Sequence, residues 1–212
     1  MAWESLDTTT GVLNVTQVNH ALAMNRLLRD VRGCEICRQC LPLPPKPILS
    51  VGIKTRVLII GQAPGLKVHE AGIPWQDKSG ETLCSWLGIS REQFLDTQIF
   101  GTMPMGFCYP GTKPGGGDLP PRPECAPAWH EKLLALMPEL QLTLLIGRFA
   151  IKKYLMSNEN LTETVRSFDI HRSAFFPLVH PSPLNFRWHA KNPWFESDVV
   201  PVLKQRVRET IG

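Results

Sequence analysis

Short, mostly apolar runs alternate along the chain with amphipathic stretches of helical length. The runs at 57–60, 98–105, 142–146 and 175–179 predict strands, and continuous apolar character is typical of strands buried in a parallel sheet. Helices are predicted over 16–32, from a Ser79 cap past Leu87, over 126–137, after Gly147, and over 198–207. We therefore expect an α/β fold, a three-layer α/β/α sandwich with a central four-stranded parallel sheet.

Length and composition indicate one folding unit. With 212 residues, 43% of them hydrophobic, the chain suits a single domain in which segment 1–50 packs on a core of 51–212. The first ten residues lack the pattern of a secretion signal, and no apolar run approaches the ~20 residues of a membrane span. We expect a cytoplasmic monomer without membrane contact. The net charge of +4 fits a polyanionic partner but does not require one.

Two loops at predicted strand ends contain candidate site residues. Gly61-Gln62-Ala63-Pro64-Gly65 follows the first strand, where glycines let backbone approach a ligand closely and Pro64 stiffens the turn. The last strand runs into His180-Pro181-Ser182-Pro183, where two prolines restrict a histidine that can donate a hydrogen bond to a ligand oxygen. Open α/β sheets bind ligands beyond the carboxyl ends of their strands. Each loop alone could be an ordinary turn.

The order of these motifs resembles the uracil-DNA glycosylase superfamily. Besides 61–65 and 180–183, the stretch Gly72-Ile73-Pro74-Trp75-Gln76-Asp77-Lys78-Ser79-Gly80 is similar to the segment that follows the first motif in bacterial and archaeal branches. Leu144-Leu145-Ile146-Gly147-Arg148-Phe149-Ala150 is similar to the family's third strand and the helix after it. The resemblance implies a monofunctional DNA N-glycosylase of base excision repair, with damaged DNA as its partner.

The resemblance also implies roles for individual residues. Trp75 would stack on a flipped base, and the backbone around Gly61 to Gly65, with Ser182, would hold the base or a phosphate. His180 would stabilise the anionic leaving base through its carbonyl oxygen. Leu184 matches the wedge that fills the gap left in the duplex. Ordinary packing is the alternative for Trp75 and for Leu184.

The first motif departs from related branches because it lacks a carboxylate. Gln62 and Ala63 cannot take a proton, although the Gln62 amide can orient a water. Asp77 matches a catalytic aspartate of another branch and is our candidate for water activation, with Glu70 in reserve; Asp77 could equally cap a helix. The family's base-reading asparagine is absent from 102–108, so uracil, hypoxanthine, xanthine and oxidised pyrimidines all remain open.

The cysteines predict a metal site. In a reducing cytosol six cysteines favour metal, redox chemistry or core packing over disulfides. Cys34 and Cys37, with the distant Cys108 and Cys125, have the layout of the superfamily's iron–sulfur branch, which implies a [4Fe–4S] cluster. Zinc would accept the same thiolates, and the cysteines could also be unligated. Cys40 could replace Cys34 or Cys37, whereas Cys84 is expected to be a core thiol.

The remaining expectations concern DNA and rival functions. The segment 185–189 could enter a groove of DNA. The core of the matched motifs contains no lysine that would indicate Schiff-base chemistry, so we expect no strand cleavage. The alternatives are a glycosylase-like binding module without the catalytic base and a hydrolase of free nucleosides. Candidate phosphate contacts lie in or near the ligand-side loops: Lys67, Lys78, Lys113, Arg122, Arg187 and Lys191.

Overall fold

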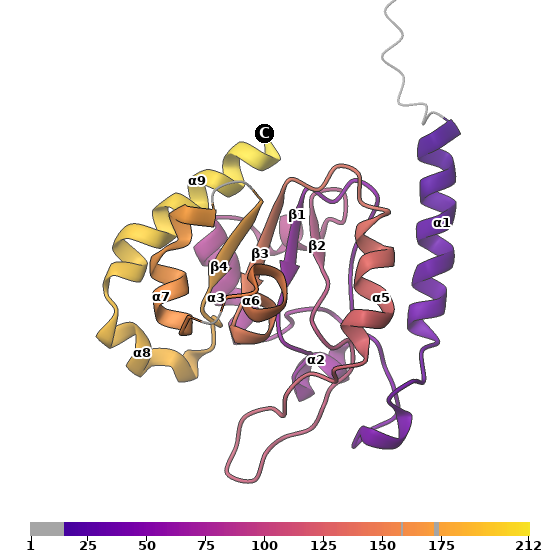
Figure 1. The fold of residues 1–212 in the computed structure, drawn as a ribbon, viewed down its shortest axis with the longest axis horizontal. Coiled ribbons are helices and arrows are strands. Elements are labelled where there is room, and N and C mark those ends of the chain that lie inside the picture. The colour runs from indigo at the N-terminus through magenta and orange to yellow at the C-terminus, as the bar shows by residue number, and fades with distance from the viewer. Residues whose placement is uncertain (1–14, 158, 172–173) are drawn as a thin grey trace, which may run out of the picture.

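The computed structural model describes residues 15–157, 159–171 and 174–212 (Figure 1). Four strands form one sheet in the order β2-β1-β3-β4, and every neighbouring pair is parallel. The strands are β1 (Val57–Ile60), β2 (Phe100–Thr102), β3 (Leu142–Ile146) and β4 (Phe175–Leu178). Because β1 lies between β2 and β3, the chain leaves it towards one edge and later crosses to the other side, which makes its carboxyl end a topological switch point.

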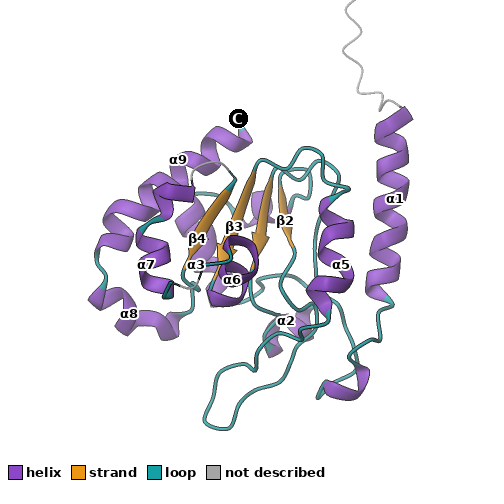
Figure 2. Cartoon of the chain, viewed as in Figure 1, coloured by secondary structure: helices purple, strands orange, loops and turns teal. Residues whose placement is uncertain are grey.

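Helices connect the strands and cover both faces of the sheet (Figure 2). The α-helices are α1 (Val15–Arg32), α2 (Leu66–Ala71), α3 (Lys78–Leu87), α4 (Arg91–Leu95), α5 (Cys125–Leu134), α6 (Arg148–Leu155), α7 (Leu161–Arg166), α8 (Phe186–Lys191) and α9 (Val200–Ile211). The 3-10 helices are η1 (Arg38–Cys40), η2 (Phe168–His171) and η3 (Pro183–Asn185), and η4 (Phe195–Val199) is a π-helical turn that runs into α9.

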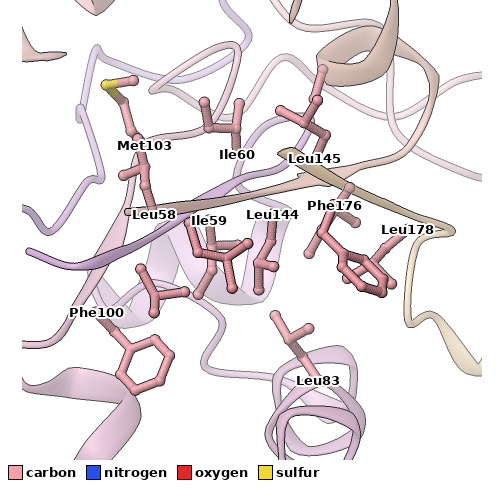
Figure 3. Packing of buried hydrophobic residues seen from close by; sticks show 14 of the residues in the cluster. Leu58, Ile59, Ile60, Leu83, Phe100, Met103, Leu144, Leu145, Phe176 and Leu178 are labelled. Carbon is pink, nitrogen blue, oxygen red and sulfur yellow. The ribbon is translucent and has the colours of Figure 1, made fainter. Parts of the chain in front are cut away.

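The core consists of two apolar layers, one on each face of the sheet. Alternate residues of a strand point to opposite faces, so Ile59 and Leu144 lie towards Leu83 of α3, while Ile60 and Leu145 point the other way (Figure 3). All five of these side chains are fully buried. Burial on both faces explains why the strand sequences are continuously apolar rather than alternating.

The predicted fold class is confirmed, with local corrections. The second strand is shorter than the predicted 98–105, because beyond Thr102 the chain turns into a loop. The prediction that Ser79 caps the next helix is wrong: Asp77 is the cap, and its Oδ1 accepts a hydrogen bond from the Gly80 N–H at 2.9 Å. Ser79 instead lies buried in the first turn of α3.

The segment before the sheet contacts the core at several points. Met24, Leu28 and Val31 of α1 are buried in the main apolar cluster. Ser50 and Thr102 form an antiparallel bridge, and the Ile48 N–H donates to the Phe107 carbonyl at 2.8 Å, so this segment lies along the end of β2. No helix in the described part of the chain is long and apolar enough to cross a membrane.

Candidate active site

A cavity of about 240 Å³ lies at the carboxyl ends of the strands, next to the switch point at β1. The loop after β1, the turn before α3 and the loop after β4 all contribute to its wall. The structure therefore brings together nine residues that the sequence singled out: Gly61, Gln62, Ala63, Pro64, Gly65, Trp75, Asp77, His180 and Ser182. Glu70, the reserve carboxylate, is on α2 and does not line the cavity.

Trp75 and His180 face each other inside this cavity. Their ring centroids are 5.5 Å apart, and the ring planes differ by 29°, which is a stacked arrangement. Gly61 lies against the indole, because a Cβ added there would be 3.1 Å from Cζ2 of Trp75. The site thus contains a flat aromatic surface with an imidazole beside it, a pair that can contact a planar ring and one of its polar atoms.

A strained turn holds Trp75 in place. Its φ of +56° is left-handed, a conformation that a bulky residue adopts only when its surroundings impose it. Arg91 supports the turn from behind, since its Nη2 donates to the Pro74 carbonyl at 2.7 Å and to Gln76 Oε1 at 3.0 Å. Arg91, at the start of α4, therefore binds the residues on either side of Trp75 and helps to hold the turn.

The close approach of Gly80 to this turn leads to a prediction about stability. A Cβ at residue 80 would lie 1.9 Å from the Trp75 carbonyl oxygen, so Gly80→Ala requires the strained backbone to move. Helix propensity alone would favour alanine by about 1 kcal/mol. We expect the clash to prevail and Gly80→Ala to lower the free energy of unfolding by about 2 kcal/mol, as backbone strain of 1–3 kcal/mol suggests.

Chemical denaturation of wild type and variant measures this difference. Gly33→Ala is the matched control, because a Cβ there meets Arg29 O at an ordinary 3.6 Å. Equal or greater stability of Gly80→Ala would show that the turn is not as tight as described.

The loop after β4 is fixed by its own side chains. Asn185 Nδ2 donates to the His180 carbonyl at 2.6 Å, and Ser182 Oγ accepts from the Leu184 N–H at 3.2 Å. Burial lowers the pKa of His180, against an opposing effect of the Asp77 charge, so the imidazole is neutral at neutral pH. Leu184 does not line the cavity; it projects from η3 with 80% of its surface exposed. Phe186, two residues later, is 63% exposed.

The opposite rim contains Gln62 and Asp118, a residue that the sequence analysis did not single out. Gln62 Nε2 donates to the Leu119 carbonyl at 3.0 Å, which ties the loop after β1 to the long hairpin between β2 and α5. The neighbouring Asp118 lines the cavity, and a Cβ at Gly65 would be 3.3 Å from its Oδ2. Asp118 belongs to no recognisable motif. The only sequence feature that marks its position is the glycine-rich stretch just before it.

The end of β2 supplies the wall where the family's asparagine is missing. Thr102 and Pro104 line the cavity there. Behind this wall the His130 Nε2–H donates to the Pro104 carbonyl at 3.0 Å, and the Tyr154 hydroxyl donates to Nδ1 at 2.7 Å. Burial lowers the pKa of His130 to about 4, which keeps the ring neutral and matches these hydrogen bonds. The backbone of this wall is therefore held rigidly.

A second cavity gathers the four cysteines of the predicted metal site. Cys34, Cys37, Cys108 and Cys125 all line it, although the two pairs are far apart in sequence, and all are free thiols. Cys40 is exposed and does not line it. Burial raises the pKa of Cys108 to about 11 and that of Cys125 to about 12. Among the described residues no group of three or more His, Cys, Asp or Glu side chains is placed to hold a metal ion.

Two further residues that the sequence singled out, Cys84 and Arg122, have clear surroundings in the structure. Cys84 is buried on α3 among apolar side chains, away from the four-cysteine cavity. Arg122 lines that cavity and forms an ion pair with Glu124, in which its side chain is 29% exposed. The other predicted phosphate contacts, Lys67, Lys78, Lys113, Arg187 and Lys191, are exposed on helices and loops near the carboxyl ends of the strands.

Comparisons with known proteins identify the family to which this chain belongs. The solution NMR structure of a "putative Uracil DNA glycosylase" from Methanosarcina acetivorans is similar to this chain at 17% sequence identity and a TM-score of 0.41, covering 75% of this chain and 97% of that one. The family model of the uracil DNA glycosylase superfamily matches residues 50–204, which include the sheet and every residue described above as lining the first cavity. The chain belongs to the uracil DNA glycosylase superfamily.

Proposed function

We propose that this protein is a monofunctional DNA glycosylase that hydrolyses the N-glycosidic bond of uracil or a related deaminated base. One observation carries the proposal: a stacking aromatic, a neutral histidine and a carboxylate, Trp75, His180 and Asp77, line the same cavity. The volume of about 240 Å³ is below the 300–1,000 Å³ of sites for larger ligands, which suits a single base.

The proposed reaction assigns each group a task. A flipped base stacks on Trp75, while the backbone of 61–65 and Ser182 hold the base or a neighbouring phosphate. The C1′–N bond breaks, its electron pair leaves with the base, and water then forms a bond to C1′ of the sugar. His180 donates a hydrogen bond to the base oxygen on which negative charge develops. Asp77 orients the water and accepts its proton.

The exposed side of the cavity supports a DNA substrate over a free nucleoside. Leu184 and Phe186 are large apolar side chains left in solvent next to the His180 loop, where a wedge into the duplex is needed. Exposed lysines and Arg187 nearby suit the phosphate backbone. A small-molecule hydrolase has no use for such a projecting surface.

A base-release screen tests this proposal. Wild-type protein is incubated with single- and double-stranded oligonucleotides that each contain one damaged base, and released base is measured. We expect release from at least one deaminated base and none from free deoxyuridine. Binding to damaged oligonucleotides without release from any of them would instead establish the binding module, and release from the nucleoside alone would establish the hydrolase.

We propose also that the four-cysteine cavity holds a [4Fe–4S] cluster. Four free thiols converge there, the donor set that such a cluster uses. Zinc would accept the same four thiolates, so the metal content of the protein decides between the two. The cluster would join the end of α1 to the start of α5 and to the chain beyond β2, a purely structural link.

The cluster prediction is tested by metal content. We expect anaerobically purified protein to be brown and to contain iron and acid-labile sulfide, and Cys108→Ser to lose both and to unfold more easily. Cys84→Ser is the matched control, because Cys84 is equally buried but outside the cavity, and it should keep its iron. Cys40→Ser should keep it too. Colourless protein that contains zinc would contradict the prediction.

A further inference from the structure

Asp118 brings a second carboxyl group to the cavity that contains Asp77. It lines that cavity from the hairpin between β2 and α5, and its Oδ2 lies against the loop after β1, 3.3 Å from where a Cβ on Gly65 would be. Both carboxyl groups line this one cavity, and the charge of Asp77 contributes to the raised pKa of Asp118.

The hairpin holds Asp118 at its base rather than at its free tip. Thr112 and Asp118 form an antiparallel bridge, and the Leu119 N–H donates to the Gly111 carbonyl at 2.8 Å. The Gln62 amide then binds the Leu119 carbonyl, one residue away. The tip projects well beyond the rest of the molecule (Figure 1), but these bonds fix the position of Asp118 against the first motif. Its place in the cavity follows from the fold.

We propose that Asp118 is a second catalytic carboxylate, which forms with Asp77 the pair that activates water and stabilises the sugar. The proposal rests on the proposed function, since it deepens the chemistry of the same cavity. The first motif contains no carboxylate, and the pair supplies what Gln62 and Ala63 cannot.

The chemistry explains why two carboxylates are useful here. When the C1′–N bond breaks, its electrons leave with the base and the sugar acquires the positive charge of an oxocarbenium ion. Attack of water then forms the O–C1′ bond and releases one proton. Before that attack the negative charge of the two carboxylates stabilises the sugar cation, and as water bonds to C1′ the pair accepts the released proton as a unit.

The surroundings of the two carboxyl groups suit different parts of this reaction. Asp77 Oδ1 already accepts a hydrogen bond from the Gly80 N–H, which fixes its orientation and leaves the other oxygen for water. Although much of Asp118 is exposed, burial of its carboxyl and the nearby Asp77 charge both raise its pKa, which suits it to share the proton that Asp77 accepts from water.

Asp118→Asn tests the proposal through the pH dependence of single-turnover base release. We expect the rate at neutral pH to fall about tenfold, less than the 10²–10⁴ of a full general base because Asp77 remains. Below neutrality the wild-type rate should fall as the pair takes up a proton. In Asp118→Asn that fall should occur at lower pH, because the carboxyl group whose pKa is raised by burial and by the Asp77 charge is then absent.

Two variants separate this role from a structural one. Asp118→Glu keeps the carboxyl group and should retain the wild-type position of the acid limb. Glu139→Gln makes the same charge change at an exposed residue just before β3, at the opposite end of the strands, and should leave rate and profile unchanged. An unaltered rate in Asp118→Asn, or a lower rate with an unmoved profile, would overturn the proposal. Failure of the proposed function is distinct, because the wild type itself would then release no base.

Discussion

Replacing His180 with alanine is expected to lower the single-turnover rate of base release by about 10²–10³-fold, the effect of losing one preorganised donor to a developing oxyanion. The imidazole is well prepared for this task. It is stacked against Trp75, its backbone carbonyl is held by Asn185, and burial lowers its pKa so that it is neutral. A neutral ring donates one N–H without first giving a proton to the base.

The loss should appear in the chemical step and leave affinity for damaged DNA almost unchanged, because the hydrogen bond strengthens only as charge develops. His20→Ala is the matched control, since His20 is on α1 and does not line the cavity. A rate for His180→Ala within threefold of wild type would remove His180 from the mechanism and leave the leaving group without an identified donor.

The sequence predicted best those features that depend on continuous burial. Strands such as Val57–Ile60 and Leu142–Ile146 are read from mostly apolar runs, because a strand buried on both faces favours apolar residues; Thr143 is the exception within Leu142–Ile146. Once the sheet is parallel, the carboxyl ends of β1 and β4 lie at the same edge, so Gly61 and His180 were expected to come together. The grouping of the four cysteines was implied by the family resemblance rather than by sheet topology, and the structure places all four around one cavity.

The features that the sequence did not predict depend on the paths of loops and on competition between neighbouring residues that can cap the same helix. Asp118 follows three glycines with positive φ, and no periodicity tells where such a hairpin returns to the core. The helix cap was misplaced because Asp77 and Ser79 are both good caps two residues apart; the close contact of Gly80 with Trp75, visible only in three dimensions, selects the former. Short helices such as α2 and α8 were missed because six residues show too little periodicity.

Asp77 has two functions in this account, and a pair of substitutions can separate them. As the helix cap it accepts a hydrogen bond from the Gly80 N–H, and as a cavity carboxylate it activates water. Asparagine caps a helix about as well as aspartate but cannot take a proton, so Asp77→Asn should keep wild-type stability. We expect this variant to lose at least about 100-fold in the single-turnover rate, the lower limit for a general base.

Alanine removes both functions, so Asp77→Ala should show the same loss of rate and, in addition, unfold at lower denaturant, by about 1 kcal/mol for the lost cap. Comparing the two variants isolates the chemical role, because they differ in stability but share the missing carboxylate. If Asp77→Asn instead retained the wild-type rate while Asp77→Ala lost it, the residue would act only by holding Trp75 and α3 in position. Water activation would then fall to the remaining cavity carboxylate, Asp118.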